Sequence, residues 1–299
     1  MKKTTMLRKL LKEPGLVFAP CAYDCLTARC VEAVGFKAVF MTGVGIRDAQ
    51  FGMPDIGILT ATEVINCIKY MANSVNIPLI VDADDGYGGA LAAYRTTQEI
   101  IRAGAAGMFI DDQKHPTKSP SIGFQEVLPR DEYLGKIGAV MEARDKEDKD
   151  FLIVARIDAL ATMGSEETVA RAKACLKLGA DMILPQCLGF PRASVESLKK
   201  TMQQLYKAIG APEVPIWGTG GPTEFTAKDY EDIGAKFLAE GVVADATLKA
   251  ALDFYQVYHD TGTVPNILIP QPSVARLRKL RGLNFWNELE RRYVVTKNI

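Results

Sequence analysis

The stretch AGAAGMFIDD, residues 103–112, runs from an alanine and a glycine into an apolar segment that ends in two aspartates. A glycine in this place is typical of a left-handed helix cap, so the stretch predicts a helix end followed at once by a buried strand. The pattern recurs in three other stretches: VGFKAVFMTG (34–43), LGADMILPQC (178–187) and IGAKFLAEGV (233–242). The chain is therefore expected to repeat one helix–strand unit.

Further apolar stretches bring the predicted strands to eight: LVFAPCAYD (16–24), IPLIVDAD (77–84), FLIVARIDA (151–159) and VPIWGTGG (214–221). Apolar runs without alternation are typical of parallel strands that are buried on both faces, and helical windows separate them. A doubly wound sheet is one alternative, but its usual GxGxxG turn is absent after the first strand. We predict an α/β fold of the (β/α)8 TIM-barrel type.

Helices are predicted at both ends of the chain. Residues 1–12 form a short amphipathic pattern. The segment 265–295 predicts a long amphipathic helix whose apolar positions include Leu277, Leu280, Leu283 and Trp286. We predict a single domain, 1–299, with a barrel core at about 16–250 and a C-terminal extension at 265–299 that covers the core or, as we favour, joins subunits.

Composition narrows the function classes. The chain has 36 basic and 36 acidic residues, so no broad field attracts nucleic acid or an anionic membrane. No signal-peptide core follows the basic first residues, and no apolar run reaches membrane-spanning length. There are only two histidines and no CxxC spacing, which argues against a zinc site and for a reduced, cytoplasmic chain. The six cysteines are at positions 21, 25, 30, 67, 175 and 187.

Acidic residues collect at the carboxyl ends of two predicted strands, where barrels of this type carry their chemistry. Asp82 and Asp84 are two positions apart, which predicts that they share one face of a strand, and Asp111 ends the next strand. Three neighbouring carboxylates repel one another unless protons or a cation intervene, and oxygen ligands suit Mg²⁺ or Mn²⁺. The alternative is that they cap helices or pair with Lys and Arg.

The order of the motifs MTGVG, MPDIG, DADDGYG, DDQ, ARIDA, GADMILPQ and TEF resembles the isocitrate lyase/phosphoenolpyruvate mutase superfamily, especially its short 2-methylisocitrate lyase-like branch. The resemblance covers about residues 16–245. Such enzymes use Mg²⁺ to cleave or form C–C or P–C bonds beside 2-oxo or 2-hydroxy carboxylates, and are commonly tetramers with exchanged C-terminal helices. The resemblance implies a small anionic carboxylate substrate and a homotetramer, and from the charge balance we expect neither nucleic acid nor membrane as partner.

The resemblance also implies roles for individual residues. Asp82, Asp84 and Asp111 match the metal shell, and Asp55 matches a further acidic residue of the site. Arg156 matches an arginine that holds the substrate, and independently a guanidinium at a strand end can clamp a carboxylate, unless it pairs internally with Asp158. The remaining implied substrate-binding residues are Thr42, Gly43, Val44, Gln186 and Thr223.

The sequence departs from the superfamily in the segment KHPTKSPSIGFQEVLP, residues 114–129. Related lyases carry a Lys-Lys/Arg-Cys-Gly-His lid whose cysteine donates a proton, and here Ser119, a far weaker acid, occupies the cysteine position. Lys118, His115 and Tyr87 are alternative donors. We predict catalytic roles for Asp55, Lys118, Ser119 and Arg156. Two further departures are Gln186 for the usual glutamate and Gly221 for the asparagine before TEF; the Lys-x-Asn-Ser lid of the phosphonate-directed branch is also absent.

The segment is about sixteen residues long, more than is usual between a strand and a helix, and its prolines and glycine suit a lid that closes over substrate. The alternative is a disordered surface loop. We expect a Mg²⁺-dependent (or Mn²⁺-dependent) lyase that cleaves a C–C bond in a small 2-hydroxy or 2-oxo di- or tricarboxylate through an enolate-type intermediate. Three alternatives stay open: an oxaloacetate-type hydrolase or decarboxylase, a P–C enzyme of the phosphonopyruvate or phosphoenolpyruvate mutase kind, and a non-catalytic binding barrel.

Overall fold

The computed structural model describes residues 1–119, 122–123, 125–186, 195–210, 216–218, 225–239, 243–265 and 274–294. The chain divides into two compact units, Met1–Val242 and Val243–Ile299, and each is described by itself. The predicted single domain, with a barrel core ending near residue 250, stays a prediction.

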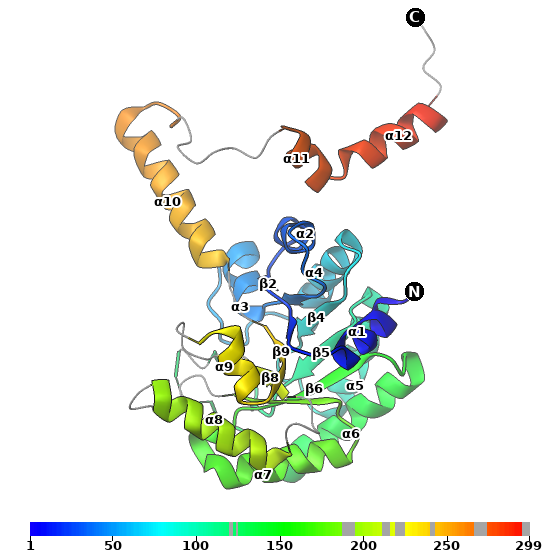
Figure 1. Ribbon diagram of the computed structural model, residues 1–299, viewed down its shortest axis with the longest axis vertical. Helices are drawn as coiled ribbons and strands as arrows, with labels where there is room; N and C mark the ends of the chain where they lie inside the picture. Colours follow the sequence, from blue (N-terminus) through cyan, green and yellow to red (C-terminus); the bar gives the residue numbers. More distant parts are fainter. Residues whose placement is uncertain are drawn as a thin grey trace, which may run out of the picture. The chain divides into compact units, whose positions relative to one another are not determined.

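The strands of the first unit form one parallel sheet (Figure 1). Its order is β1-β9-β8-β7-β6-β5-β4-β3-β2. β1 and β2 are two halves of one stretch that is interrupted at Pro20. β1 pairs with β9 and β2 pairs with β3, so this stretch closes the sheet into a barrel. Counted as one strand, the two halves give the eight strand positions that the sequence predicts. The predicted barrel is confirmed. The strands are β1 (Val17–Phe18), β2 (Cys21–Ala22), β3 (Val39–Met41), β4 (Leu79–Asp82), β5 (Gly107–Ile110), β6 (Leu152–Ile157), β7 (Met182–Pro185), β8 (Ile216–Gly218) and β9 (Ala235–Leu238).

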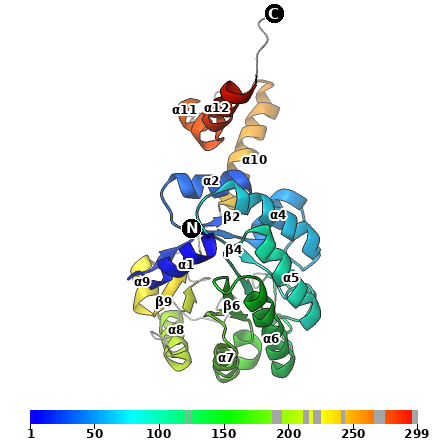
Figure 2. The same cartoon turned by 90° about the vertical axis from the view of Figure 1, so that its right-hand side faces the viewer.

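Helices of the first unit surround the barrel (Figures 1 and 2). Several begin where a side chain caps the first turn: Asp24 accepts from the backbone of Thr27, and Thr60 does the same for Glu63. The helices are α1 (Lys3–Lys12), α2 (Cys25–Ala33), α3 (Gly43–Ile46), the wide turn η1 (Arg47–Phe51), α4 (Ala61–Ser74), α5 (Ala90–Ala103), α6 (Arg130–Glu147), α7 (Leu160–Lys177), α8 (Val195–Ile209) and α9 (Ala227–Asp232).

The glycines of the repeated helix–strand unit adopt the left-handed conformation that the sequence pattern predicts. Their φ angles are 102° at Gly35, 99° at Gly104, 100° at Gly179 and 92° at Gly234. Residues with a Cβ atom disfavour this conformation, so glycine ends each helix and turns the chain into the next strand.

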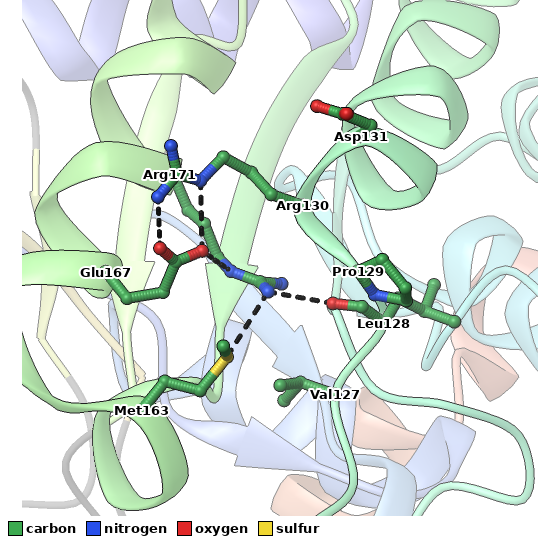
Figure 3. A pocket seen from close by; sticks show the side chains of 8 residues that line it. All are labelled: Val127, Leu128, Pro129, Arg130, Asp131, Met163, Glu167 and Arg171. Carbon is green, nitrogen blue, oxygen red and sulfur yellow. Dashed lines mark hydrogen bonds and ion pairs between the residues drawn. The ribbon is translucent and has the colours of Figure 1, made fainter.

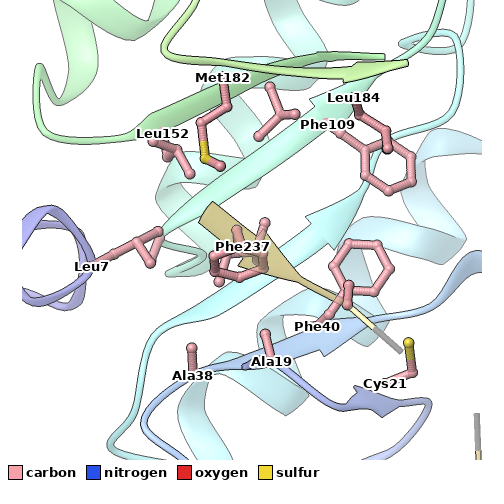
Figure 4. Packing of buried hydrophobic residues seen from close by; sticks show 14 residues of the cluster. Leu7, Ala19, Cys21, Ala38, Phe40, Phe109, Leu152, Met182, Leu184 and Phe237 are labelled. Atoms are coloured by element: carbon pink, nitrogen blue, oxygen red, sulfur yellow. The ribbon is translucent and has the colours of Figure 1, made fainter. Parts of the chain in front are cut away.

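The core fills the inside of the barrel (Figure 4). Phe40 of β3 and Phe109 of β5 stack with 5.3 Å between ring centroids. The predicted N-terminal helix forms as α1, and its Leu7 is fully buried in the same cluster. Arg8 donates to the carbonyl of Phe151, just before β6, so α1 covers the amino ends of the strands.

The second unit contains α10 (Ala244–Thr261), α11 (Val274–Leu280) and α12 (Leu283–Tyr293). The prediction of one long helix over 265–295 is wrong, because Gly282, at φ 68°, separates α11 from α12. Residues 266–273 and the side chain of Leu277 lie outside the described part. No residue of α10 or α12 is buried. None of the helices in the described ranges combines the length and the hydropathy needed to cross a bilayer.

Candidate active site

A polar layer continues the barrel interior at the carboxyl ends of the strands. Side chains two positions apart on a strand point to the same side, so a polar residue two positions after a core residue extends the interior lining. Five predicted site residues have this relation to the core: Thr42 follows Phe40, Asp82 follows Ile80, Asp111 follows Phe109, Arg156 follows Val154 and Gln186 follows Leu184. All but Asp82, which keeps partial contact with solvent, are buried.

Asp84 reaches the same place by a turn. The prediction that it shares a strand face with Asp82 is wrong, because β4 ends at Asp82 and Asp84 has a left-handed φ of 46°. The amide of Asp84 donates to Oδ1 of Asp82 at 3.0 Å, and the amide of Asp111 donates to the carbonyl of Asp84 at 2.9 Å. The three aspartates therefore lie at one end of two neighbouring strands.

Arg47 is a site residue that sequence reasoning missed. It starts η1, its side chain is 1% exposed, and its Nη1 lies 2.8 Å from Asp55 Oδ1. Its Nη2 forms an ion pair with Asp84, whose Oδ2 also accepts from the Tyr87 hydroxyl at 3.0 Å. The available signal was a charge inside MTGVGIRDAQFG, between two predicted site motifs.

Gly43 gives these groups the space they need. A Cβ atom here would lie 2.5 Å from both Arg47 Nη1 and Asp82 Oδ2, so only glycine fits between them without a shift. The neighbouring Thr42 caps α3, accepting from the Gly45 amide at 3.5 Å. Gly43 thus lies directly beside the Asp82 carboxylate, and the substrate-binding role of residues 42–44 stays a prediction.

Arg156 is held by Asp158. Its Nε and Nη2 donate to the two oxygens of Asp158, both at 2.9 Å, which leaves Nη1 outside this pair. Asp112 accepts from the Asp158 amide at 2.7 Å and from Arg171 Nη1 at 3.0 Å. The internal pair considered as an alternative to substrate binding therefore exists, and it fixes the orientation of the guanidinium.

Burial and mutual repulsion shift the acidic groups. Burial, together with the charge of Asp84, raises the pKa of Asp82 to about 7, although Arg156 and Arg47 oppose the shift. Burial raises the pKa of Asp111 well above its ordinary value, with Arg156 acting in the opposite direction. Burial also raises the pKa of Asp55 despite its ion pair with Arg47. The two arginines therefore do not balance the carboxylates, and the site favours an added cation or protons.

These residues fit a magnesium ion that keeps part of its water shell. In the described ranges, no three His, Cys, Asp or Glu side chains are grouped so that they could hold a metal alone. Mg²⁺ rarely uses an all-protein cage and is usually bound by one or two carboxylates, waters and substrate oxygens. The oxygen-only donors and the surplus negative charge around Asp82 and Asp111 meet that requirement.

The predicted lid begins against the site. The Ser119 amide donates to the Asp55 carbonyl at 3.1 Å, and a Cβ atom on Gly57 would lie 2.5 Å from the Thr117 amide, so the two loops pack closely. Lys118 is exposed, and its amide donates to Gln113 Oε1 at 2.8 Å. The structure does not pair the Lys118 ammonium with a carboxylate of the described residues.

The other two alternative proton donors, Tyr87 and His115, contact different aspartates. Tyr87 contacts Asp84 directly, and burial raises its pKa well above the ordinary value. His115 is half exposed, with its Nδ1 3.5 Å from Oδ2 of buried Asp85. Thr223 and Gly221 lie outside the described residues.

A cavity of about 560 Å³ lies next to the Asp112–Arg171 pair, at the start of α6 and α7 (Figure 3). Buried Arg171 donates to the Leu128 carbonyl and pairs with Glu167, which also pairs with Arg130. None of the predicted metal residues lines this cavity. Arg130 and Arg171 both pair with Glu167, and Arg171 supports Asp112.

The sequence matches the family model described as phosphoenolpyruvate phosphomutase over residues 7–256. The chain belongs to the phosphoenolpyruvate phosphomutase family. It is 34% identical over 294 residues to the petal death protein of Dianthus caryophyllus, covering 98% of this chain and 89% of that protein. It is 30% identical over 295 residues to the 2,3-dimethylmalate lyase of Eubacterium barkeri, covering 98% and 99%.

Solved structures of the family agree in fold. An oxaloacetate acetylhydrolase in complex with 3,3-difluorooxalacetate superposes with a TM-score of 0.85 at 29% identity, covering 97% of this chain and 96% of that one. A phosphonopyruvate hydrolase complexed with oxalate and Mg²⁺ gives a TM-score of 0.85 at 27% identity, covering 99% and 100%. The predicted superfamily and the prediction that the chain is an enzyme of that superfamily are confirmed.

Proposed function

We propose that this chain is a Mg²⁺-dependent lyase that cleaves a C–C bond in a small 2-hydroxy or 2-oxo di- or tricarboxylate through an enolate-type intermediate. The observation that carries the proposal is the surplus of negative charge at the partly buried Asp82 and the buried Asp111, near the fixed guanidinium of Arg156. Such a site accepts a divalent cation together with an anionic substrate. Mn²⁺ is a possible replacement for Mg²⁺.

The proposed roles follow from position. Asp82 and Asp111 would hold the ion, directly or through water, with Asp84 beside them. Bound Mg²⁺ would supply a Lewis acid that stabilises negative charge developing on the substrate. Arg156 would direct Nη1 at a substrate carboxylate, because Asp158 occupies its other two nitrogens. Residues 42–44 would line the substrate beside Asp82, and Gln186 and Thr223 would complete the pocket.

Proton transfer is assigned to the lid and its surroundings. Asp55 would act beside the metal shell, and its carbonyl anchors Ser119 in the position that the superfamily gives to a cysteine. Lys118 would balance the enolate charge when the lid moves inward, since its exposed side chain is free of ion pairs with the described carboxylates. Tyr87 stays protonated at neutral pH because its pKa is raised. Its hydroxyl contacts Asp84, so it is an alternative proton donor beside the aspartates.

Assembly and location belong to the same proposal. We propose a homotetramer in which the second unit, residues 243–299, packs on a neighbouring subunit. Its exposed apolar side chains support this, among them Leu252, Tyr255, Phe285 and Trp286. We place the protein in the cytoplasm because of its cysteine pattern, and the five cysteines in the described ranges are free thiols.

A substrate screen tests the function. Purified protein with Mg²⁺ is assayed for release of pyruvate, glyoxylate or oxaloacetate from substituted malates, methylisocitrate, oxaloacetate and phosphonopyruvate. We expect a substituted 2-hydroxy acid to be cleaved and Asp82→Asn to be inactive. Turnover of none of these compounds would favour the non-catalytic barrel instead.

Hydrolysis is the second candidate function, and Ser119 is the observation that favours it. A lyase must draw a proton for its carbanion-like product from an acid of the protein, and a serine hydroxyl is a much weaker acid than the thiol it replaces. In hydrolysis the attacking water brings both the hydroxyl group for one fragment and the proton for the other. The oxaloacetate acetylhydrolase and phosphonopyruvate hydrolase to which this chain is similar give the chemical precedent. Acetate and oxalate from oxaloacetate, or phosphate and pyruvate from phosphonopyruvate, would identify this activity in the same screen.

A further inference from the structure

Arg47 occupies an unusual place for a permanently charged side chain. Its guanidinium is buried between Asp55 and Asp84 and lies against Gly43, across from Asp82 Oδ2. Its Nε is a buried donor without a hydrogen-bond partner in the described part of the chain. A buried arginine cannot lose its proton to relieve strain, so it persists here only because the carboxylates surround it.

The same carboxylates are those on which a divalent cation would depend. The charge of Arg47 is balanced by its ion pairs with Asp84 and Asp55, and Asp82 Oδ2 lies across Gly43 from Arg47 Nη1. A divalent ion at Asp82 would therefore be repelled by a fixed positive charge a few ångströms away. Asp84 could coordinate that ion fully only by breaking its ion pair with Arg47.

We propose that Arg47 is an internal counter-ion that competes with the divalent cation. It keeps Asp55 and Asp84 in place without metal, and it weakens the affinity of the site for Mg²⁺. Arg47 is thus a positioning residue, and the inference rests on the magnesium site of the proposed function.

The competition between Arg47 and the cation also determines which groups are left to coordinate the ion. With Asp84 Oδ2 engaged by Arg47 and by Tyr87, the protein offers mainly Asp82 and Asp111 to the ion. The other coordination positions are then left to water and to the substrate carboxylate, which suits the preference of Mg²⁺ for few protein ligands.

The test compares Arg47→Met with wild type in the full-length protein. Mg²⁺ affinity is measured by titration calorimetry, and Tm is measured with EDTA and with 10 mM MgCl₂. We expect Arg47→Met to bind Mg²⁺ at least about tenfold more tightly, because a repelling charge is removed from a poorly screened site. Its Tm in EDTA should fall, because Asp55 and Asp84 lose their partner, and Mg²⁺ should raise its Tm more than that of wild type.

Two variants act as controls. Arg47→Lys keeps the charge and should bind Mg²⁺ within about threefold of wild type. Arg95→Met removes the same charge from the exposed surface of α5 and should leave both Mg²⁺ affinity and Tm unchanged. A variant Arg47→Met that folds only with Mg²⁺ also supports the proposal.

Two outcomes overturn it, and they separate the inference from the proposed function. If wild type binds Mg²⁺ and Arg47→Met binds it no more tightly, the competition is wrong and the magnesium site stands. If neither protein binds Mg²⁺ by calorimetry or by a shift in Tm, both the competition and the magnesium site are wrong.

Discussion

At the scale of single residues, the site shows how far position along a strand predicts chemistry. Asp82, Asp111 and Arg156 were visible in the sequence because each stands where an apolar strand ends. Arg47 was not visible in this way, because a charged residue in a short helical segment is expected to be exposed to solvent unless its partners in space are known. The ion pair with Asp84 depends on a left-handed turn at Asp84 that a period-two pattern cannot predict.

The first residue-scale prediction concerns Asp84. Asp84→Asn should lower kcat at saturating Mg²⁺ at least about 100-fold, because it removes charge from the site that stabilises the transition state. It should also lower Tm, since Arg47 keeps only Asp55 as an ion-pair partner. Asp48→Asn on the exposed side of η1 is the matched control and should leave both quantities nearly unchanged. An Asp84→Asn enzyme with more than a tenth of wild-type kcat would contradict the assignment.

The second prediction concerns the pH dependence of stability. Asp82 has a pKa of about 7 when folded, against an ordinary 3.8, so between these values the unfolded chain gives up a proton that the folded protein retains. The free energy of unfolding should therefore fall as pH rises from about 4 to 7, and level off above. Thermal unfolding in EDTA at pH 5.5 and 8 measures this, with the lower Tm expected at pH 8.

Asp82→Asn is the control for the pH experiment. It should reduce the difference in Tm without abolishing it, because burial also raises the pKa of Asp112 to about 7. Adding Mg²⁺ to wild type should reduce the difference as well, since the ion favours the ionised carboxyl. A higher Tm at pH 8 than at pH 5.5 in EDTA would show that the sign is wrong.

At the scale of elements, the glycine caps and the strand ends account for the accuracy of the fold prediction. The four left-handed glycines leave a plain signal, because few other residues adopt that conformation. Gly282 gives the same signal inside the C-terminal segment, and the amphipathic pattern on either side concealed it. A periodic pattern predicts which side chains share a face, while a single left-handed residue decides whether the helix continues.

The tight contact at Gly43 gives the first element-scale prediction. Gly43→Ala should destabilise the protein by about 1–3 kcal/mol, because its Cβ would collide with Arg47 and Asp82. Gly135→Ala is the control: Gly135 is at an exposed position of α6 with nothing near the added atom, and the change should stabilise the protein by about 0.5–1 kcal/mol. Urea unfolding of both variants measures the difference, and equal effects would refute the close packing.

The lid gives the second element-scale prediction. Ser119→Ala should lower kcat about tenfold or less, from loss of a hydrogen bond. Lys118→Ala should lower it more, because it removes a cation that balances the enolate when the lid closes. Lys114→Ala, which removes an exposed lysine of the same loop, serves as the control. If Ser119→Ala is as inactive as Asp84→Asn while Lys118→Ala is near normal, Ser119 acts chemically and our account of the lid is wrong.

At the scale of the whole molecule, the second unit has apolar surface without a covering partner in the described chain. Phe285 and Trp286 are 62% and 64% exposed, and α12 buries none of its residues. Patches of this kind mark contacts between proteins. The periodic apolar pattern was apparent from the sequence, but no local signal in the sequence identifies the surface that would cover it.

Sedimentation tests the assembly. Wild type should sediment as a tetramer at micromolar concentration, and the double variant Phe285→Ser/Trp286→Ser should shift toward smaller species because it removes apolar contact area. Leu91→Ser, at an exposed apolar position of α5, should keep the tetramer. A stable wild-type monomer would refute the proposal.

The split first strand determines when the barrel can close during synthesis. β1 pairs Val17 with Phe237, so the earliest strand to leave the ribosome must wait for one of the last strands. Until then both edges of the growing sheet expose unpaired backbone groups, the arrangement that promotes mispairing between nascent chains. Contacts this distant in sequence also slow folding. The protein should therefore depend on chaperones more during translation than its finished barrel, in which the described strands close into a ring, would suggest.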